Sequence, residues 1–311
     1  MKIKNVTVIG AGMMGNALAQ VFASNPELHV VLRTRELKPD RFKPIENNLD
    51  IMIERGAATE EKAILSRIHF VTDLKEATQD ADFVIECAPE VMETKQNLFA
   101  EIENYCREDC ILATNTSVMS PTEISEKCRR RERVVGAHFW NPGHLIPLVE
   151  VVKSNYTSEQ VVEDTIALMK ACGKKPIYCK KDVPGFVANR LQHAIWREAF
   201  YMVQEGIADP ATVDDACKYG PGLRWPVMGP MENSDLVGIQ LSYNIQNYVL
   251  KHLADNHEPS PMLQEMIDRG ELGFKSGKGW QTWTPEQIEY SSRHLKEYLI
   301  DYAAKMKKEE A

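Results

Sequence analysis

The chain has 311 residues, which is longer than one hydrophobic core usually organises, so its length alone predicts two domains. Its net charge is −8, because 37 basic residues stand against 45 acidic ones. Such a surface repels a phosphate backbone and argues against a nucleic-acid-binding protein. No apolar run reaches the roughly 18 residues that a membrane-spanning helix needs.

The beginning of the chain and its cysteines indicate the compartment. Met1 and Lys2 lead directly into the apolar run 3–9, without the pattern of a signal peptide. The seven cysteines are scattered, with no CxxC pair, which is typical of reduced thiols rather than of a disulfide framework or a zinc site. We therefore expect a soluble cytoplasmic protein that holds no metal.

Short β-branched runs alternate with helical patterns through the first half of the chain. The runs predict buried strands, and a helix follows the first of them at residues 13–23. Strands separated by helices indicate βαβ units and a doubly wound α/β fold, with a parallel sheet covered on both faces. The expected strands are at 6–9, 29–32, 68–71, 83–85, 111–113 and 134–136, with a further strand beginning near Leu148.

Residues 44–67 interrupt this alternation with two helical patterns. The apolar periodicity breaks at Gly56, and a new helix cap is expected at Thr59 before Glu60. We interpret the segment as a helical hairpin that projects from the sheet as an arm.

Strand patterns nearly vanish after residue 182. Helical patterns take their place at 186–204, from Asp209 onward, at 236–253 and at 285–306. This change predicts a domain boundary, with an α/β domain at 1–182 and an all-α domain at 183–311.

The turn after the first strand has the sequence Gly10-Ala11-Gly12-Met13-Met14-Gly15, a GxGxxG motif. The motif alone is weak evidence, but here it lies between a strand and a helix, where each glycine has a role. The first allows a tight turn, the second admits a pyrophosphate, and the third lets helix and strand pack closely. The sequence therefore predicts a Rossmann-type dinucleotide site, with the phosphates at the start of the helix.

The acidic residue that NAD-selective sites carry at the end of the second strand is missing. Thr34 occupies this position, between Arg33 and Arg35. Without a carboxylate to repel it, a 2′-phosphate can pair with one or both guanidinium groups. The sequence therefore favours NADP(H), with NAD(H) as the alternative if both arginines are merely solvated.

A histidine and a glutamate lie near two expected strands, at His138 and Glu150. A His–Glu pair suits acid–base catalysis, because the carboxylate fixes the imidazole tautomer and stabilises the imidazolium. The residues alone leave two interpretations open, a catalytic base or a structural histidine at a strand end.

Six segments, taken in order, carry a resemblance to one family. They are residues 10–15, Asn115-Thr116-Ser117, His138-Phe139-Trp140-Asn141-Pro142, Leu148-Val149-Glu150-Val151, Pro184-Gly185-Phe186-Val187-Ala188-Asn189-Arg190 and Gly273-Phe274-Lys275-Ser276-Gly277-Lys278-Gly279. Their sequences and spacing resemble the L-3-hydroxyacyl-CoA dehydrogenase family, in both domains and over nearly the whole chain.

The resemblance implies a role for each matching residue. His138 would be the catalytic acid/base and Glu150 its partner, while Ser117 and Asn189 would hydrogen-bond the reacting substrate. The cofactor contacts implied beyond the glycine turn are Ser117, Glu90, Lys95, Asn115, Asn141 and Lys275. The arm would face coenzyme A, and the all-α domain would form a homodimer, with apolar positions of 236–253 and 295–304 at the interface.

The implied reaction is the reversible oxidation of an L-3-hydroxyacyl-CoA, short-chain and 3-hydroxybutyryl-CoA-like, to the 3-oxoacyl-CoA, as in fatty acid metabolism. The segment 220–230 departs from the family pattern and is similar to relatives that act on free L-gulonate or L-carnitine. Arg224 in this segment suits a substrate carboxylate and equally suits packing on Trp225. A dehydrogenase of a free 3-hydroxy acid is therefore the alternative, and a non-catalytic nucleotide-binding structural protein is a second one.

Overall fold

The computed structural model describes residues 2–58 and 61–310 of the chain. The chain divides into two compact units, of which one runs to Asn189 and resumes at His294, and the other spans Arg190–Arg293. The helix cap expected at Thr59 and Glu60 lies outside the described residues.

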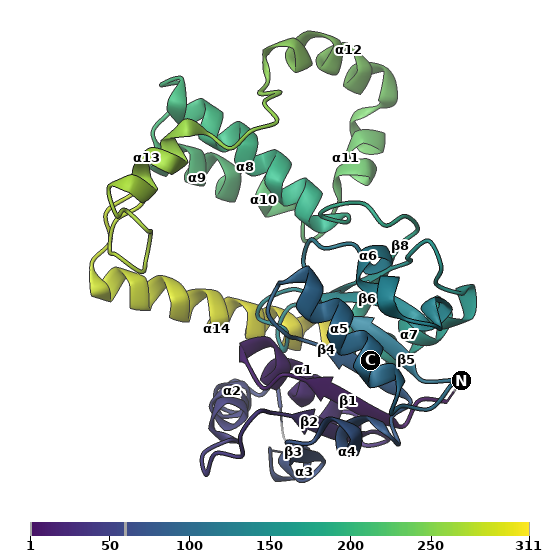
Figure 1. Cartoon of the computed structure of the whole chain (residues 1–311). Coiled ribbons are helices and arrows are strands. Elements are labelled where there is room, and N and C mark those ends of the chain that lie inside the picture. Colours follow the sequence, from purple (N-terminus) through teal and green to yellow (C-terminus); the bar gives the residue numbers. More distant parts are fainter. Residues whose placement is uncertain (1, 59–60, 311) are drawn as a thin grey trace. The chain divides into compact units, whose positions relative to one another are not determined.

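An eight-stranded sheet with the order β3-β2-β1-β4-β5-β6-β7-β8 forms the centre of the first unit (Figure 1). Its strands are β1 (Asn5–Ile9), β2 (His29–Arg33), β3 (Ile68–Val71), β4 (Phe83–Glu86), β5 (Ile111–Thr114), β6 (Val134–Phe139), β7 (Leu148–Val152) and β8 (Lys175–Cys179). Phe83 and Ile85 belong to one buried apolar cluster and Val84 to another, so both faces of the sheet are covered. The doubly wound Rossmann-type fold expected from the sequence is confirmed.

Two strands near one edge differ from the parallel sheet that was expected. β7 runs antiparallel to β6. Only residues 140–147 connect these two strands, and this is too short for the crossover that parallel neighbours need. β8, which the sequence analysis did not predict, pairs parallel with β7. Its polar start and Pro176 obscure the strand pattern.

Helices cover the sheet, and two of them form the expected arm. The helices of the first unit include α1 (Met13–Ala23), α2 (Lys43–Glu54), α3 (Glu61–Ser66), α4 (Leu74–Thr78), α5 (Met92–Glu103), α6 (Pro121–Ile124) and α7 (Glu159–Ala171). In α2 and α3, Ile45, Leu49 and Ile64 are buried in the main apolar cluster together with Leu18 and Phe22 of α1. The arm is therefore packed onto the core, and the expectation that it projects from the sheet was wrong.

The second unit is helical, as the sequence predicted. Its helices are the greater part of α8 (Ala188–Gln204), then α9 (Pro210–Tyr219), α10 (Pro221–Arg224), α11 (Pro230–Val237), α12 (Ile239–Val249), α13 (Pro261–Asp268) and the beginning of α14 (Pro285–Glu310). Residues 190–293 are all described, and Met266 is the only one of them that is buried. Within the described chain, no helix combines the length and the apolar character needed to cross a membrane.

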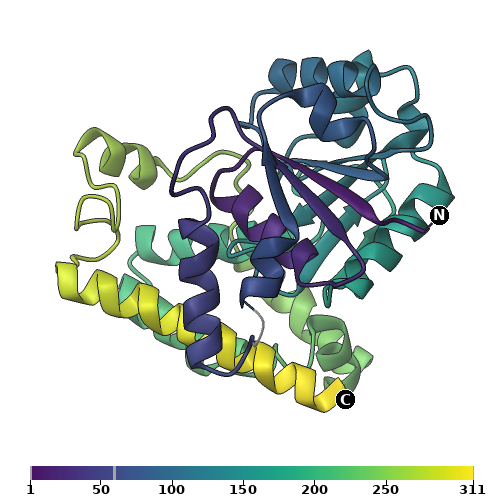
Figure 2. The same ribbon diagram turned by 90° about the horizontal axis from the view of Figure 1, so that it is seen from below.

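The later part of α14 belongs to the first unit, whereas the sequence analysis assigned all residues after 182 to the second domain. Ile300 is almost fully buried. The Arg55 guanidinium, which follows α2, donates to the Asp301 carboxylate through Nε at 2.9 Å and through a second nitrogen at 2.5 Å. Figure 2 shows α14 passing beside α2. A bidentate ion pair therefore joins the later part of α14 to the end of α2 in the arm.

Candidate active site

The turn from β1 to α1 has the shape that a bound pyrophosphate requires. Gly10 has a φ of 104°, in the region that favours glycine. A Cβ added at Gly15 would lie 1.6 Å from the Gly10 carbonyl oxygen, whereas one added at Gly12 would meet nothing. Both Gly10 and Gly12 line a cavity of about 1250 Å³ that extends to the end of β2. The turn and its cavity fit a dinucleotide.

The far end of this cavity is rich in cations. Arg33, Thr34 and Arg35 line it, but β2 ends at Arg33, whose Nε donates to the Thr72 carbonyl oxygen at 3.1 Å. Arg41 also lines the cavity, and the sequence analysis missed it. Its guanidinium lies 5.3 Å from the centre of the Phe42 ring and 5.7 Å from that of Phe70. Its position next to an aromatic residue, in the loop after the second strand, could have identified Arg41 as a candidate cofactor-binding residue.

His138 and Glu150 lie directly opposite each other on the antiparallel strands β6 and β7. The His138 Nδ1 and the Glu150 Oε2 are 2.8 Å apart, and both side chains are buried. The Trp140 indole N–H donates to the same carboxylate oxygen at 3.1 Å, while the backbone N–H groups of Val187 and Ala188 donate to Oε1, each at 2.9 Å. The carboxylate thus holds Nδ1, and the imidazole Nε2 remains for a reacting group.

The Glu150 carboxylate is kept in its charged form. Burial raises its pKa, but the hydrogen bonds from His138, Ala188, Val187 and Trp140 together bring the pKa below its usual value. A charged carboxylate at this position would stabilise an imidazolium at His138.

The loop after β5 carries Ser117 and is fixed from two sides. The Ser117 backbone N–H donates to Glu90 Oε1 at 3.0 Å, and its carbonyl oxygen accepts from Asn189 Nδ2 at 3.0 Å. Asn115 Oδ1 accepts from the Phe139 N–H at 2.8 Å and so joins this loop to β6. The side chain of Ser117 is exposed, which leaves its hydroxyl available to a ligand.

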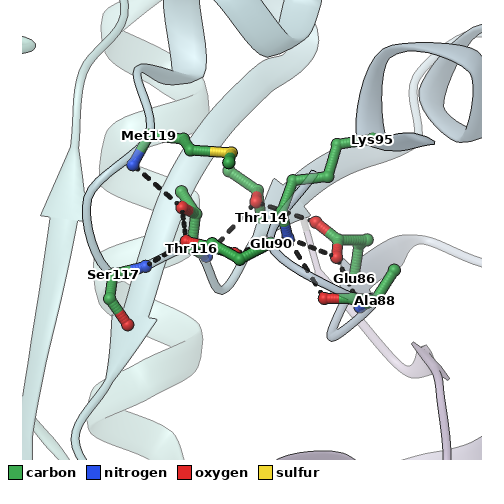
Figure 3. A network of polar contacts seen from close by, with 8 residues as sticks. All are labelled: Glu86, Ala88, Glu90, Lys95, Thr114, Thr116, Ser117 and Met119. Atoms are coloured by element: carbon green, nitrogen blue, oxygen red, sulfur yellow. Dashed lines mark hydrogen bonds and ion pairs between the residues drawn. The ribbon is translucent and has the colours of Figure 1, made fainter. Parts of the chain in front are cut away.

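Glu90 and Lys95 are parts of a polar network under this loop (Figure 3). From the residues alone, both belong to an ordinary exposed helix start, but Lys95 is buried. Its ammonium lies 2.7 Å from Glu86 Oε1, 3.1 Å from Glu90 Oε2 and 3.4 Å from the Ala88 carbonyl oxygen. These contacts occupy the three N–H donors of the lysine.

Other predicted site residues lie elsewhere. Met13 and Met14 begin α1, and Met13 is exposed. Asn141 is exposed in the connection between β6 and β7. Lys275 and Arg224 belong to the second unit, whereas the nucleotide cavity is lined by residues of the first. The roles of both residues stay predictions.

Comparisons with known proteins define the family. Residues 5–183 match the family model of the 3-hydroxyacyl-CoA dehydrogenase NAD binding domain, and residues 185–283 match that of the 3-hydroxyacyl-CoA dehydrogenase C-terminal domain. The chain therefore belongs to the 3-hydroxyacyl-CoA dehydrogenase family, as its motifs predicted. It has the Rossmann-type NAD-binding domain of this oxidoreductase family.

Relatives within the family differ in the substrates that their names give. The 5-formyl-3-hydroxy-2-methylpyridine 4-carboxylate 5-dehydrogenase of Mesorhizobium japonicum is 31% identical over 92% of both chains. A solved structure of an enzyme of that name has a TM-score of 0.88 and covers 97% of both chains. A solved (S)-3-hydroxybutyryl-CoA dehydrogenase of Ralstonia eutropha is 32% identical, with a TM-score of 0.75, over 91% of this chain and all of its own. L-carnitine dehydrogenase of Bacillus cereus is 38% identical over 76% of this chain and 72% of its own.

The lowered pKa of Glu150 predicts how stability depends on pH. The carboxylate contributes stability above its unfolded pKa, and this contribution is lost as the pH falls through the lower folded pKa. We expect the difference in unfolding free energy between wild type and Glu150→Gln to shrink as the pH falls below about pH 4. Urea unfolding at each pH measures it. A difference that stays constant down to pH 3 would contradict the prediction.

Proposed function

We propose that the chain catalyses the reversible oxidation of a 3-hydroxy group to a ketone with a nicotinamide cofactor. His138 takes the hydroxyl proton on Nε2, and Glu150 stabilises the imidazolium. The Ser117 hydroxyl and the Asn189 side chain hold the reacting oxygen. The nicotinamide, when bound, supplies the hydride acceptor. In the reverse direction, His138 returns the proton to the new alcohol.

The buried pair of His138 and Glu150 carries this proposal. Four hydrogen bonds to the Glu150 carboxylate come from His138 on β6, from Trp140 just after it, and from Val187 and Ala188 at the start of α8. A charged carboxylate enclosed in this way costs solvation energy, which a purely structural histidine would not require. The arrangement supports a base whose tautomer and orientation are set before the substrate arrives.

The arm supports a free hydroxy acid as the substrate. Coenzyme A carries several phosphate charges, and an arm that faced it would need cations. Residues 44–67 contain three basic and five acidic residues. One of the three, Arg55, is paired with Asp301, and Glu297 lies 4.0 Å from it. Both acidic residues come from α14, which lies beyond the segment matched by the family model. The end of this chain therefore neutralises a cation of the arm.

The thioester remains the second candidate substrate. The 3-hydroxybutyryl-CoA dehydrogenase noted above is 32% identical to this chain, which supports an L-3-hydroxyacyl-CoA of short chain length. The free acid is supported by the higher TM-score of a pyridine carboxylate dehydrogenase structure, 0.88 against 0.75, and by the resemblance of the segment around Arg224. We propose that Arg224 binds the substrate carboxylate.

A substrate panel tests the reaction and the substrate together. Acetoacetyl-CoA and 3-hydroxybutyryl-CoA would be compared with L-carnitine, L-gulonate and 3-hydroxybutyrate by nicotinamide absorbance. We expect turnover of a free acid at a kcat/KM at least about tenfold above that of either thioester, and a loss of kcat of at least about a hundredfold in His138→Gln with cofactor binding intact. Preference for a thioester would overturn the free-acid proposal. Cofactor binding without any turnover would favour the non-catalytic structural protein.

For the cofactor we propose a preference for NADP(H) over NAD(H). Five cations, Arg33, Arg35, Lys38, Arg41 and Lys43, line the end of the cavity around Thr34, against the carboxylates of Glu36 and Asp40. A 2′-phosphate can accept from a guanidinium at two oxygens at once, which favours binding at such an end.

Substitution of the arginines tests this preference. We expect wild type to have a kcat/KM at least about tenfold higher with NADPH than with NADH, and Arg35→Ala or Arg41→Ala to remove most of the difference. Arg33→Ala should act in the same direction but less, because its Nε already donates to Thr72. Arg129 is not among the residues that line the cavity, so Arg129→Ala serves as the control. Preference of wild type for NADH would refute the proposal.

We propose that the protein is a homodimer formed through its helical unit. A unit of this size with one buried residue lacks a core of its own, and α12 exposes Ile239, Leu241, Tyr243 and Ile245. A second copy of the same surface would cover them. We expect a dimeric mass by light scattering at micromolar concentration, and dissociation in Leu241→Glu but not in Tyr105→Glu, whose exposed side chain lies in the first unit. A monomeric wild type would rule the dimer out.

The cytoplasm is the compartment that we propose. All seven cysteines are free, and burial raises the pKa of the Cys87 thiol beside the nucleotide cavity. Such protonated thiols suit a reducing compartment.

A further inference from the structure

Glu86 is a buried carboxylate at the end of β4, and it does not line the nucleotide cavity. It is fully enclosed, and both of its oxygens are used. Oε1 accepts from the Lys95 ammonium at 2.7 Å and from the Ala88 N–H, while Oε2 accepts from the Thr114 hydroxyl at 2.9 Å. Figure 3 shows this carboxylate on the far side of Lys95 from the Ser117 loop.

Lys95 depends on Glu86 more than on its other carboxylate. A buried ammonium needs a counterion because it has lost its hydration. The Lys95 side chain is 1% exposed and that of Glu86 is 0% exposed, whereas that of Glu90 is 40% exposed and lies farther from the ammonium, at 3.1 Å. Water weakens the Glu90 contact. Glu86 therefore fixes the position of the ammonium.

Glu90 in turn holds the loop of Ser117. Its Oε1 accepts from the Thr116 hydroxyl and from the Ser117 N–H, and the Thr116 hydroxyl oxygen accepts from the Met119 N–H at 3.0 Å. Burial raises the pKa of Glu90, but the Thr116 hydrogen bond and the Lys95 charge bring it below its usual value. The charged carboxylate thus orients the backbone, and the Ser117 hydroxyl points away from the network (Figure 3).

We propose that Glu86 is a positioning residue for Ser117, acting through Lys95 and Glu90. The carboxylate of Glu86 keeps the ammonium at a distance at which Glu90 can pair with it and still accept from the loop. When Glu86 is replaced by glutamine, the ammonium leaves its place between the two carboxylates, and Glu90 is no longer held where it accepts from the loop. The kinetic part of this inference rests on the proposed role of Ser117, whereas its structural part does not.

Hydrogen exchange tests the structural part without a substrate. In Glu86→Gln of the full-length protein, we expect the amides of Ser117 and Met119 to exchange at least about tenfold faster than in wild type, since both donate within the network. Glu103→Gln is the matched control, because Glu103 is also a buried carboxylate, but it pairs with Arg129 and Arg130. It should lower stability without affecting these two amides. Unchanged exchange in Glu86→Gln would overturn the proposal.

A second variant covers the case in which Glu86→Gln fails to fold. Glu86→Gln/Lys95→Met removes both charges, and replacing both partners of a buried pair is often tolerated. We expect this double variant to recover stability but to keep the fast exchange at Ser117 and Met119, because Glu90 has lost its ammonium. Recovery of slow exchange together with stability would mean that the pair serves folding alone, and would overturn the positioning role.

Kinetics then connects the network with the reaction. With the substrate of highest turnover in the panel, Glu86→Gln should lower kcat by at least about tenfold while the NADPH dissociation constant changes less than about threefold. In a Ser117→Ala background, the same substitution should change kcat by less than about twofold, because the residue that it positions is gone. Equal effects in both backgrounds would overturn the inference. A Ser117→Ala variant with normal kcat would instead refute the proposed role of Ser117, whatever the exchange result.

Discussion

The hydrogen bond between His138 and Glu150 depends on the direction of one strand. If β7 ran parallel to β6, a long crossover would separate the two residues, and the pair would not face each other. Because the connection is short, β7 turns back, and the register sets the carboxylate opposite the imidazole. The same carboxylate accepts from Val187 and Ala188, so it also fixes the residues at which α8 begins. Asn189 is the next residue, and its side chain holds the Ser117 carbonyl oxygen. One buried carboxylate thus organises the base and one side of the Ser117 loop.

Charge is distributed unevenly between the two ends of the site. At the catalytic end, carboxylates are buried and each is matched by donors, as at Glu150 and Glu86. At the far end of the nucleotide cavity, Arg33 and Arg41 are partly exposed and Arg35 is exposed. In the proposed function, the buried Glu150 carboxylate would stabilise charge that appears on His138, and the arginines would stabilise charge that arrives with the cofactor.

The sequence was sufficient for the fold where local pattern and glycine geometry decide the outcome. The turn at Gly10 and the helix that follows it at 13–23 formed as their residue types require. The sequence was insufficient where the burial or the pairing of a residue depends on a partner that is distant along the chain. Lys95 looked like a helix-surface residue because nothing nearby in sequence shows that Glu86 is buried beside it. The antiparallel turn of β7 was likewise hidden, since an apolar run gives no direction. The candidate roles of Ser117 and Asn189 came from family resemblance, which spacing alone could not supply.

Helix α8 has consequences for both halves of the chain. Its first turn is held by Glu150 in a well-packed unit, while most of its length belongs to a unit in which only Met266 is buried. Such a unit can keep its helices in place only if other apolar surface covers them, because isolated helices of this length are marginal in water. Whatever covers the helical unit therefore also steadies the helix that carries Asn189. In the proposed homodimer, association would therefore add to the local hydrogen bonds that orient Asn189 beside the Ser117 loop.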